Sequence, residues 1–121
     1  MAGETILIVD DSVGAQDIAK RILELAGYRV IEAGNGVAAF VCPEIATVDL
    51  AIVDTDMPGF DGEETIKSMR AAQASHGVPI LLLVPEAKAE ARASQSLHGA
   101  NGYLLKPYEP EFLLRKARTL I

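Results

Sequence analysis

The sequence predicts an α/β domain in which helices cover both faces of a parallel sheet. Five short aliphatic runs, each suited to a buried strand, alternate with segments whose apolar residues recur at helical spacing. The connections between them are short, and the 121 residues contain no linker and no fixed-period repeat. Alternation of this kind is typical of parallel sheets with helical crossovers. We therefore expect one domain over residues 1–121.

The first strand and helix are expected between residues 5 and 27. Thr5–Val9 is a nearly continuous aliphatic run, as expected for a strand that is buried on both faces. Ser12 is suited to cap the helix that follows, and Gly27 is suited to the left-handed position that ends it. The apolar spacing of this helix predicts an inward face made of Ile18, Ile22, Leu25 and Ala26.

The remaining elements follow in strict alternation. Strands are expected over residues 28–33, 50–53, 80–84 and 102–105. Helices are expected after Gly34–Gly36 to about Cys42, after the loop at residues 54–62, over residues 86–97 and from Pro110 onward. The third of the five helices should turn Ile66 and Met69 inward. The last should do so with Phe112, Leu113, Ala117 and Leu120.

Composition excludes several classes of protein. Eleven basic residues against seventeen acidic ones give a net charge of −6 and a pI of about 4.8. An overall field of this sign argues against direct nucleic-acid binding and against adhesion to an anionic membrane. The single cysteine, Cys42, excludes a disulfide framework within the chain. With no signal-peptide pattern at residues 1–4 and no apolar run long enough to span a bilayer, we expect a cytoplasmic protein.

Acidic residues and one lysine follow three of the expected strands. Asp10 and Asp11 end the first strand, Asp54 and Asp56 follow the third, and Lys106 follows the fifth. The carboxyl ends of parallel strands lie at one edge of a sheet, where such folds bind their ligands. Each aspartate alone suits a turn, but clustered carboxylates repel one another unless a cation joins them. Carboxylate and carbonyl oxygens are ligands for Mg²⁺, so the pattern favours a functional site.

At this point the sequence resembles the receiver domain of bacterial two-component response regulators. The motifs that carry the resemblance are Ile8–Ser12, Glu32–Gly36, Asp49–Gly62 and Gly99–Pro107, and the match covers the whole chain. The resemblance implies a flavodoxin-like fold with a parallel five-stranded sheet in the order 2-1-3-4-5.

The resemblance also implies a role for each acidic residue. Asp54 would be the phosphoacceptor for the phosphohistidine of a sensor histidine kinase or phosphotransfer protein. Asp10, Asp11, Asp54 and the backbone carbonyl of Asp56 would hold Mg²⁺. Lys106 would contact the phosphoryl oxygens as a point charge. The only reactions that the domain would catalyse are its own phosphorylation and dephosphorylation.

The output side is likewise implied by the family. Tyr103 matches an aromatic position that turns inward on activation, although a half-buried strand tyrosine explains it equally well. Helix 86–97, the strand over residues 102–105 and the last helix would form the face for a downstream protein or output domain. We expect a monomer or weak dimer, either acting alone or joined to an output region.

One departure from the family pattern concerns the switch. Where family members carry Thr or Ser followed by Ala, this chain has Val84 and Pro85, so a hydroxyl and a backbone N–H that would contact the phosphoryl group are both missing. Thr55 is a poor substitute because neighbouring strand side chains face opposite ways. Two hypotheses follow: a phosphoacceptor receiver, and an interaction module with the same fold whose partner binding ignores phosphorylation.

Overall fold

The computed structural model describes residues 3–34, 47–55, 62–71, 77–85 and 100–121. The described strands pair in parallel in the order β2-β1-β3-β4-β5, which confirms the predicted flavodoxin-like topology. Their bounds lie within one residue of those expected from the sequence: β1 (Thr5–Val9), β2 (Arg29–Ala33), β3 (Leu50–Asp54), β4 (Ile80–Pro85) and β5 (Gly102–Lys106).

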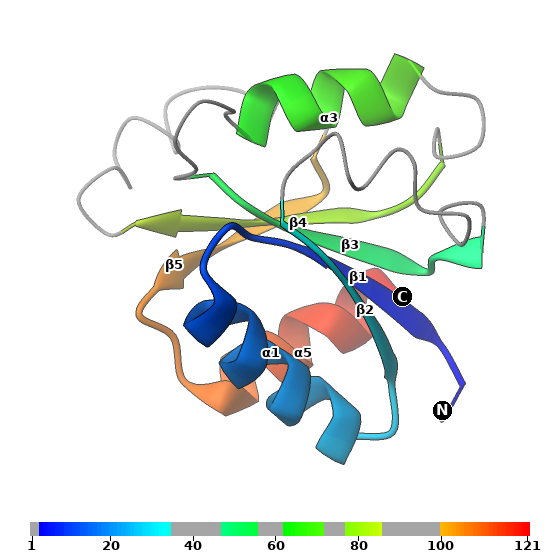
Figure 1. The fold of residues 1–121 in the computed structure, drawn as a ribbon. Helices are drawn as coiled ribbons and strands as arrows, with labels where there is room; N and C mark the ends of the chain where they lie inside the picture. The colour runs from blue at the N-terminus through cyan, green and yellow to red at the C-terminus, as the bar shows by residue number, and fades with distance from the viewer. Residues whose placement is uncertain (1–2, 35–46, 56–61, 72–76, 86–99) are drawn as a thin grey trace.

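The described helices lie on both faces of this sheet (Figure 1). Helices α1 (Val13–Leu25) and α5 (Pro110–Leu120) cover one face, and α3 (Gly62–Ala71) covers the other. The helix predicted from after Gly36 to about Cys42 and the helix predicted over residues 86–97 lie outside the described residues. Among the helices that are described, none is both long enough and apolar enough to cross a membrane.

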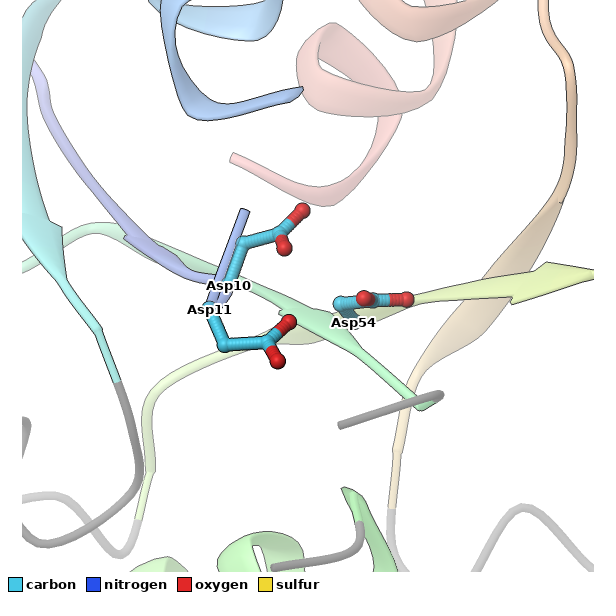
Figure 2. A group of neighbouring side chains, drawn as sticks. All are labelled: Asp10, Asp11 and Asp54. Atoms are coloured by element: carbon cyan, nitrogen blue, oxygen red, sulfur yellow. The ribbon is translucent and has the colours of Figure 1, made fainter. Parts of the chain in front are cut away.

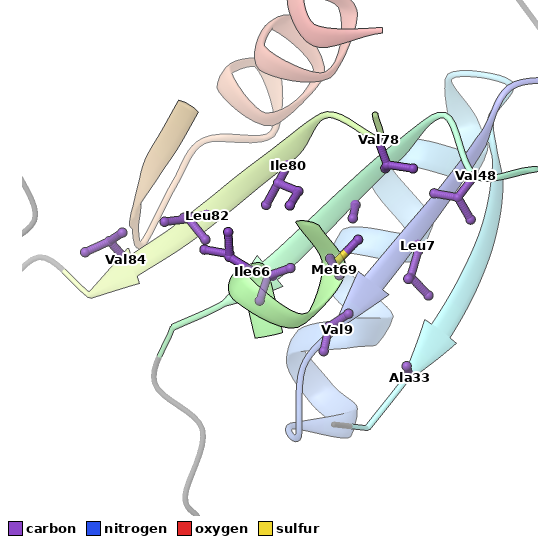
Figure 3. Packing of buried hydrophobic residues seen from close by; sticks show 12 residues of the cluster. Leu7, Val9, Ala33, Val48, Ile66, Met69, Val78, Ile80, Leu82 and Val84 are labelled. Carbon is purple, nitrogen blue, oxygen red and sulfur yellow. The ribbon is translucent and has the colours of Figure 1, made fainter. Parts of the chain in front are cut away.

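Each face of the sheet has its own hydrophobic core, because successive side chains of a strand point to opposite faces. Ile6 and Ile8 of β1 pack with α1 and α5, whereas Leu7 and Val9 pack in the cluster beneath α3. Figure 3 shows the α3-side cluster, which consists of Leu7, Val9, Ala33, Val48, Ala51, Val53, Ile66, Met69, Val78, Ile80, Leu82 and Val84. Strands buried on both sides explain why the sequence runs are continuous rather than alternating.

Helix α1 begins and ends as predicted but packs through a different face. The Ser12 hydroxyl accepts a hydrogen bond from the Ala15 N–H at 3.2 Å, and Gly27 adopts a φ of 100° after the helix. The predicted inward face is wrong for Ile18, which is 60% exposed, and for Leu25, which is 90% exposed, whereas Ile22 is partly buried against the core as expected. The buried residues are instead Gln16, Ala19 and Leu23.

The other two described helices match their expected faces more closely. Ile66 and Met69 of α3 are fully buried, as are Leu113 and Ala117 of α5. Phe112 was predicted to face inward, but it is 43% exposed, and the Arg115 guanidinium lies 5.6 Å from its ring centroid. At the margin of α5, Phe112 therefore makes a cation–π contact with Arg115 instead of being fully buried.

Candidate functional site: an acidic cluster with one lysine

Three aspartates converge at the carboxyl end of the sheet (Figure 2). Strands β1 and β3 are neighbours with Val9 opposite Val53, so the residues that follow, Asp10 and Asp54, emerge side by side. One carboxylate oxygen from each of Asp10, Asp11 and Asp54 lies within 4.8 Å of the others. Asp10 and Asp54 are buried, at 2% and 3% exposure, whereas Asp11 is exposed. The predicted convergence of these acids is therefore present in the structure.

Lys106 completes the cluster from the edge strand β5. Its Nζ atom donates a hydrogen bond to Asp54 Oδ1 at 2.7 Å, and the Asp54 side chain is only 4% exposed. In the sheet register Lys106 lies opposite Pro85 of β4, so its long side chain extends past β4 to reach β3. A charge-assisted bond of this length is stronger than a bond between neutral groups. Lys106 and Asp54 therefore form an ion pair at the carboxyl edge of the sheet.

Backbone contacts hold Asp10 in place. Its carboxylate Oδ1 accepts from the Ser12 N–H at 2.9 Å, and its own N–H donates to the Ala33 carbonyl at 3.0 Å. Burial raises the pKa of the Asp10 carboxyl, and the negative charges of Asp54 and Asp11 raise it further, although the Ser12 hydrogen bond and the Lys106 charge act in the opposite direction. Despite the nearby Lys106 ammonium, ionising this carboxyl in the folded protein therefore costs more free energy than ionising it in water.

The composition of the cluster fits a hard divalent cation. Three ionised carboxylates beside one ammonium leave two negative charges. All the side-chain atoms offered are oxygens, which Mg²⁺ prefers, and the exposure of Asp11 leaves room for the waters that Mg²⁺ retains. Asp56, whose backbone carbonyl was expected to join this set, lies outside the described residues.

The end of β4 presents no hydroxyl and no N–H donor toward the acidic cluster. Val84 is fully buried in the α3-side cluster. The Leu83 carbonyl faces β3, where it accepts from the Thr55 N–H and the Thr55 hydroxyl, each at 3.0 Å. Alternate residues of a strand present their backbone to the same neighbour, so the nitrogen of Pro85 also faces β3, but proline carries no N–H. The Thr55 hydroxyl is committed to Leu83.

Two tyrosines lie near Lys106 in the sequence: Tyr103 is in β5, and Tyr108 follows the strand. Tyr103 is half-buried and packs against the α3-side cluster. Tyr108 packs against the cluster beneath α1 and α5 and borders a pocket of about 480 Å³ whose lining also includes Asp10, Pro85 and Lys106. Burial raises the pKa of the Tyr108 hydroxyl, and the Asp10 charge raises it further.

Gln16 was not predicted to be part of this region. It is a buried polar residue of α1 whose amide contacts the Asp10 carbonyl. The available signal was its spacing: Gln16 precedes Ala19 and Leu23 by three and seven residues, so it shares their face. Because that face contains a glutamine and an alanine, a search for the most apolar stripe of the helix selects a different face.

Comparison with known proteins places the chain in one family. The model of the response regulator receiver domain matches residues 6–118. Chemotaxis protein CheY-3 of Vibrio cholerae is 33% identical over 112 residues, which are 92% of this chain and 86% of that protein. The chain belongs to the response regulator receiver domain family of two-component signalling.

Solved structures agree with this assignment. The chain matches CheY4 of Vibrio cholerae with a TM-score of 0.88 and 33% identity, over 99% of this chain and 100% of that one. It also matches the receiver domain of the sensor histidine kinase PA1611 from Pseudomonas aeruginosa PAO1, with a TM-score of 0.85 and 28% identity over 98% of each chain. That structure holds a magnesium ion in its active-site cleft. The chain spans about half the length of the transcriptional regulators among its curated relatives.

Proposed function

We propose that this receiver domain accepts a phosphoryl group on Asp54 from the phosphohistidine of a sensor histidine kinase or phosphotransfer protein. The observation that carries the proposal is the convergence of the Asp10, Asp11 and Asp54 carboxylates within 4.8 Å, with the Lys106 ammonium 2.7 Å from Asp54. A structural role alone does not account for three like charges at one sheet edge, two of them buried, because their repulsion disfavours the fold.

In the proposed reaction, a carboxylate oxygen of Asp54 attacks the phosphorus atom of the donor. A P–O bond forms while the P–N bond to the donor imidazole breaks, and the electron pair of that bond returns to the nitrogen, which takes up a proton. Lys106, already beside Asp54, would stabilise the charge on the phosphoryl oxygens. Mg²⁺ held by Asp10, Asp11, Asp54 and the Asp56 carbonyl would neutralise further charge on the transferring group.

The same proposal covers the protein's partners. The domain would catalyse its own phosphorylation and dephosphorylation and no other reaction, in the cytoplasm, as a monomer or weak dimer. Its downstream partner would contact the face formed by β5 and α5, together with residues 86–97. Tyr103, Phe112 and Lys116 border a pocket of about 430 Å³ on the described part of that face. The downstream partner would be a protein or an output domain, and the net charge of −6 argues against direct nucleic-acid binding.

A second candidate function is an interaction module whose partner binding does not depend on phosphorylation. The observation that favours it is the end of β4, where Val84 is enclosed in an apolar cluster and Pro85 has no N–H. A hydrogen bond to a charged group contributes about 1.5–3 kcal/mol. Two missing bonds would remove about 3–6 kcal/mol, which is at least the free energy that couples typical allosteric sites, about 1–3 kcal/mol. Asp54 could therefore accept a phosphoryl group without this phosphorylation changing the binding of a partner.

Phosphorylation of the purified protein by acetyl phosphate tests the first function. Intact mass should show the gain of one phosphoryl group that requires Mg²⁺ and disappears in Asp54→Ala. The matched control is Asp17→Asn, which removes an exposed carboxylate of α1 away from the cluster and should be phosphorylated like the wild type. If the folded wild type binds Mg²⁺ yet gains no mass from acetyl phosphate or from a cognate kinase, the acceptor proposal is wrong and the interaction module is favoured.

A further inference from the structure

Gln16 forms hydrogen bonds with two strand ends from the buried face of α1. Its side-chain Nε2 atom donates to the Asp10 carbonyl at 2.6 Å and to the Ala33 carbonyl at 3.1 Å. These two bonds use both protons of the amide group. The residue is 8% exposed, so it is a buried polar side chain whose donors are fully used. Gln16 thereby joins α1 to the carboxyl ends of β1 and β2.

The two bonds form part of a closed network around Asp10. The Asp10 N–H donates to the same Ala33 carbonyl at 3.0 Å, and the Asp10 carbonyl receives the second Gln16 proton. Both backbone groups of Asp10 are therefore held, one by β2 directly and the other through the glutamine. A hydrocarbon side chain at position 16 would leave the buried Asp10 carbonyl without this donor, which costs free energy.

The peptide that Gln16 holds is the one that joins two of the clustered acids. The Asp10 carbonyl and the Asp11 N–H belong to one planar peptide unit, so fixing the carbonyl fixes the rotation of that plane. The direction in which the Asp11 side chain leaves the backbone depends on this rotation. Asp11 is exposed, and the repulsion of Asp10 and Asp54 would favour other orientations of its carboxylate.

We propose that Gln16 is a positioning residue for the Mg²⁺ site: it orients the Asp10–Asp11 peptide so that both carboxylates face Asp54 before the ion binds. This inference rests on the proposed function, in which these three acids bind Mg²⁺. Residues that orient metal ligands typically change metal affinity by about 10–100-fold when they are lost. Gln16 touches neither the ion nor the reacting atoms in this scheme, and it acts only through the backbone of Asp10.

Calorimetric titration of the full chain with Mg²⁺ tests the inference through binding rather than phosphorylation. Gln16→Met keeps the length of the side chain and removes both donors, and we expect its Mg²⁺ dissociation constant to rise about tenfold. The matched control is Leu23→Val, on the same buried face of α1, which should lower stability and leave the Mg²⁺ dissociation constant unchanged. Gln16→Leu is a second donor-free variant in case methionine packs poorly.

A spectroscopic readout separates positioning from general loosening. In the metal-free protein, the NMR amide signal of Asp11 should shift in Gln16→Met and remain in place in Leu23→Val. Wild-type Mg²⁺ affinity in both folded Gln16 variants, or an equal loss in Leu23→Val, would overturn the positioning role and leave the proposed function intact. Absence of Mg²⁺ binding by the wild type would instead overturn the metal site and this inference together.

Discussion

Replacing Val84 by threonine tests the end of β4, where the chain departs from its family. Val84 is fully buried in the α3-side cluster, so the substitution places a hydroxyl where a methyl group packs. Loss of the methyl group costs roughly 0.8 kcal/mol. A buried hydroxyl without a partner costs about 1–3 kcal/mol. We therefore expect Val84→Thr to lower the free energy of unfolding by about 2–4 kcal/mol in the metal-free protein, which a domain stable by about 5–15 kcal/mol tolerates.

The measurement is urea denaturation, with and without Mg²⁺ and beryllofluoride as a stand-in for the phosphoryl group. If the new hydroxyl reaches a phosphoryl oxygen on Asp54, a bond to a charged group would recover about 1.5–3 kcal/mol, so most of the penalty should disappear. The matched control is Val78→Thr, in the same cluster but two residues before the start of β4, whose penalty should not depend on beryllofluoride. An unchanged stability of metal-free Val84→Thr would refute the enclosed position of this residue. A penalty that beryllofluoride does not reduce would refute its access to the acceptor.

Three further predictions concern charge and hydrogen bonding. Because burial and neighbouring charges raise the pKa of Asp10, the folded state holds this proton more tightly than the unfolded chain, and the resulting stability is complete below the ordinary aspartate pKa and lost as pH rises through the raised one. Asp10→Asn should therefore be more stable than the wild type at pH 7 without Mg²⁺, and this gain in stability should shrink as the pH is lowered. Urea denaturation at pH 7 and at an acidic pH measures the difference, and a variant less stable than the wild type at pH 7 would contradict the prediction. The same substitution should lower the pKa of Tyr108, because it removes the Asp10 charge that raises it. Absorbance titration of the phenol, compared with Tyr108→Phe, measures this shift, and an unchanged value would rule out the coupling. Asn101→Ala should lower the free energy of unfolding by about 1–3 kcal/mol, because Asn101 Oδ1 accepts from the Ile80 N–H and from Arg70 Nη2, each at 2.9 Å. Denaturation of Asn101→Asp, which keeps an acceptor, should show a smaller loss.

The strands and the acidic cluster could be predicted from sequence because the signals are local. A strand buried on both faces requires a continuous aliphatic run, and each of the five runs proved to be a strand. Parallel strands with helical crossovers bring their carboxyl ends to one edge, so the positions of Asp10, Asp54 and Lys106 followed from the order of the elements alone. Neither inference required knowledge of side-chain packing.

The buried face of a helix, and the side chains that support the acidic residues from behind, could not be predicted in the same way. The strongest apolar stripe of α1 includes Ile18 and Leu25, yet the sheet receives the face of Gln16, Ala19 and Leu23. Small residues allow a helix to approach the sheet closely, and a buried glutamine is tolerated because two carbonyls accept its protons. The identity of those carbonyls depends on how α1 packs against the ends of β1 and β2, and the spacing of residues within α1 does not reveal this packing.

The burial of the strands is unequal, and the residues of the proposed acceptor site come from strands of different burial. Strands β1 and β3 are buried along their whole length, whereas every residue of β5, at the end of the sheet, is only partly buried. Amides of central strands exchange with solvent near the free energy of global unfolding, while edge elements open locally at lower cost. Asp10 and Asp54 thus belong to the most protected part of the chain, and Lys106 to a part that opens more readily.

A local opening of β5 would withdraw the ammonium from Asp54 while the acids keep their places. A molecule that bound the face of β5 and α5 in its closed form would suppress such openings by mass action and raise the fraction of chains with the ion pair intact. The half-buried edge strand would therefore let partner binding act on the Asp54–Lys106 pair, and this effect would require neither a hydroxyl at position 84 nor an N–H at position 85.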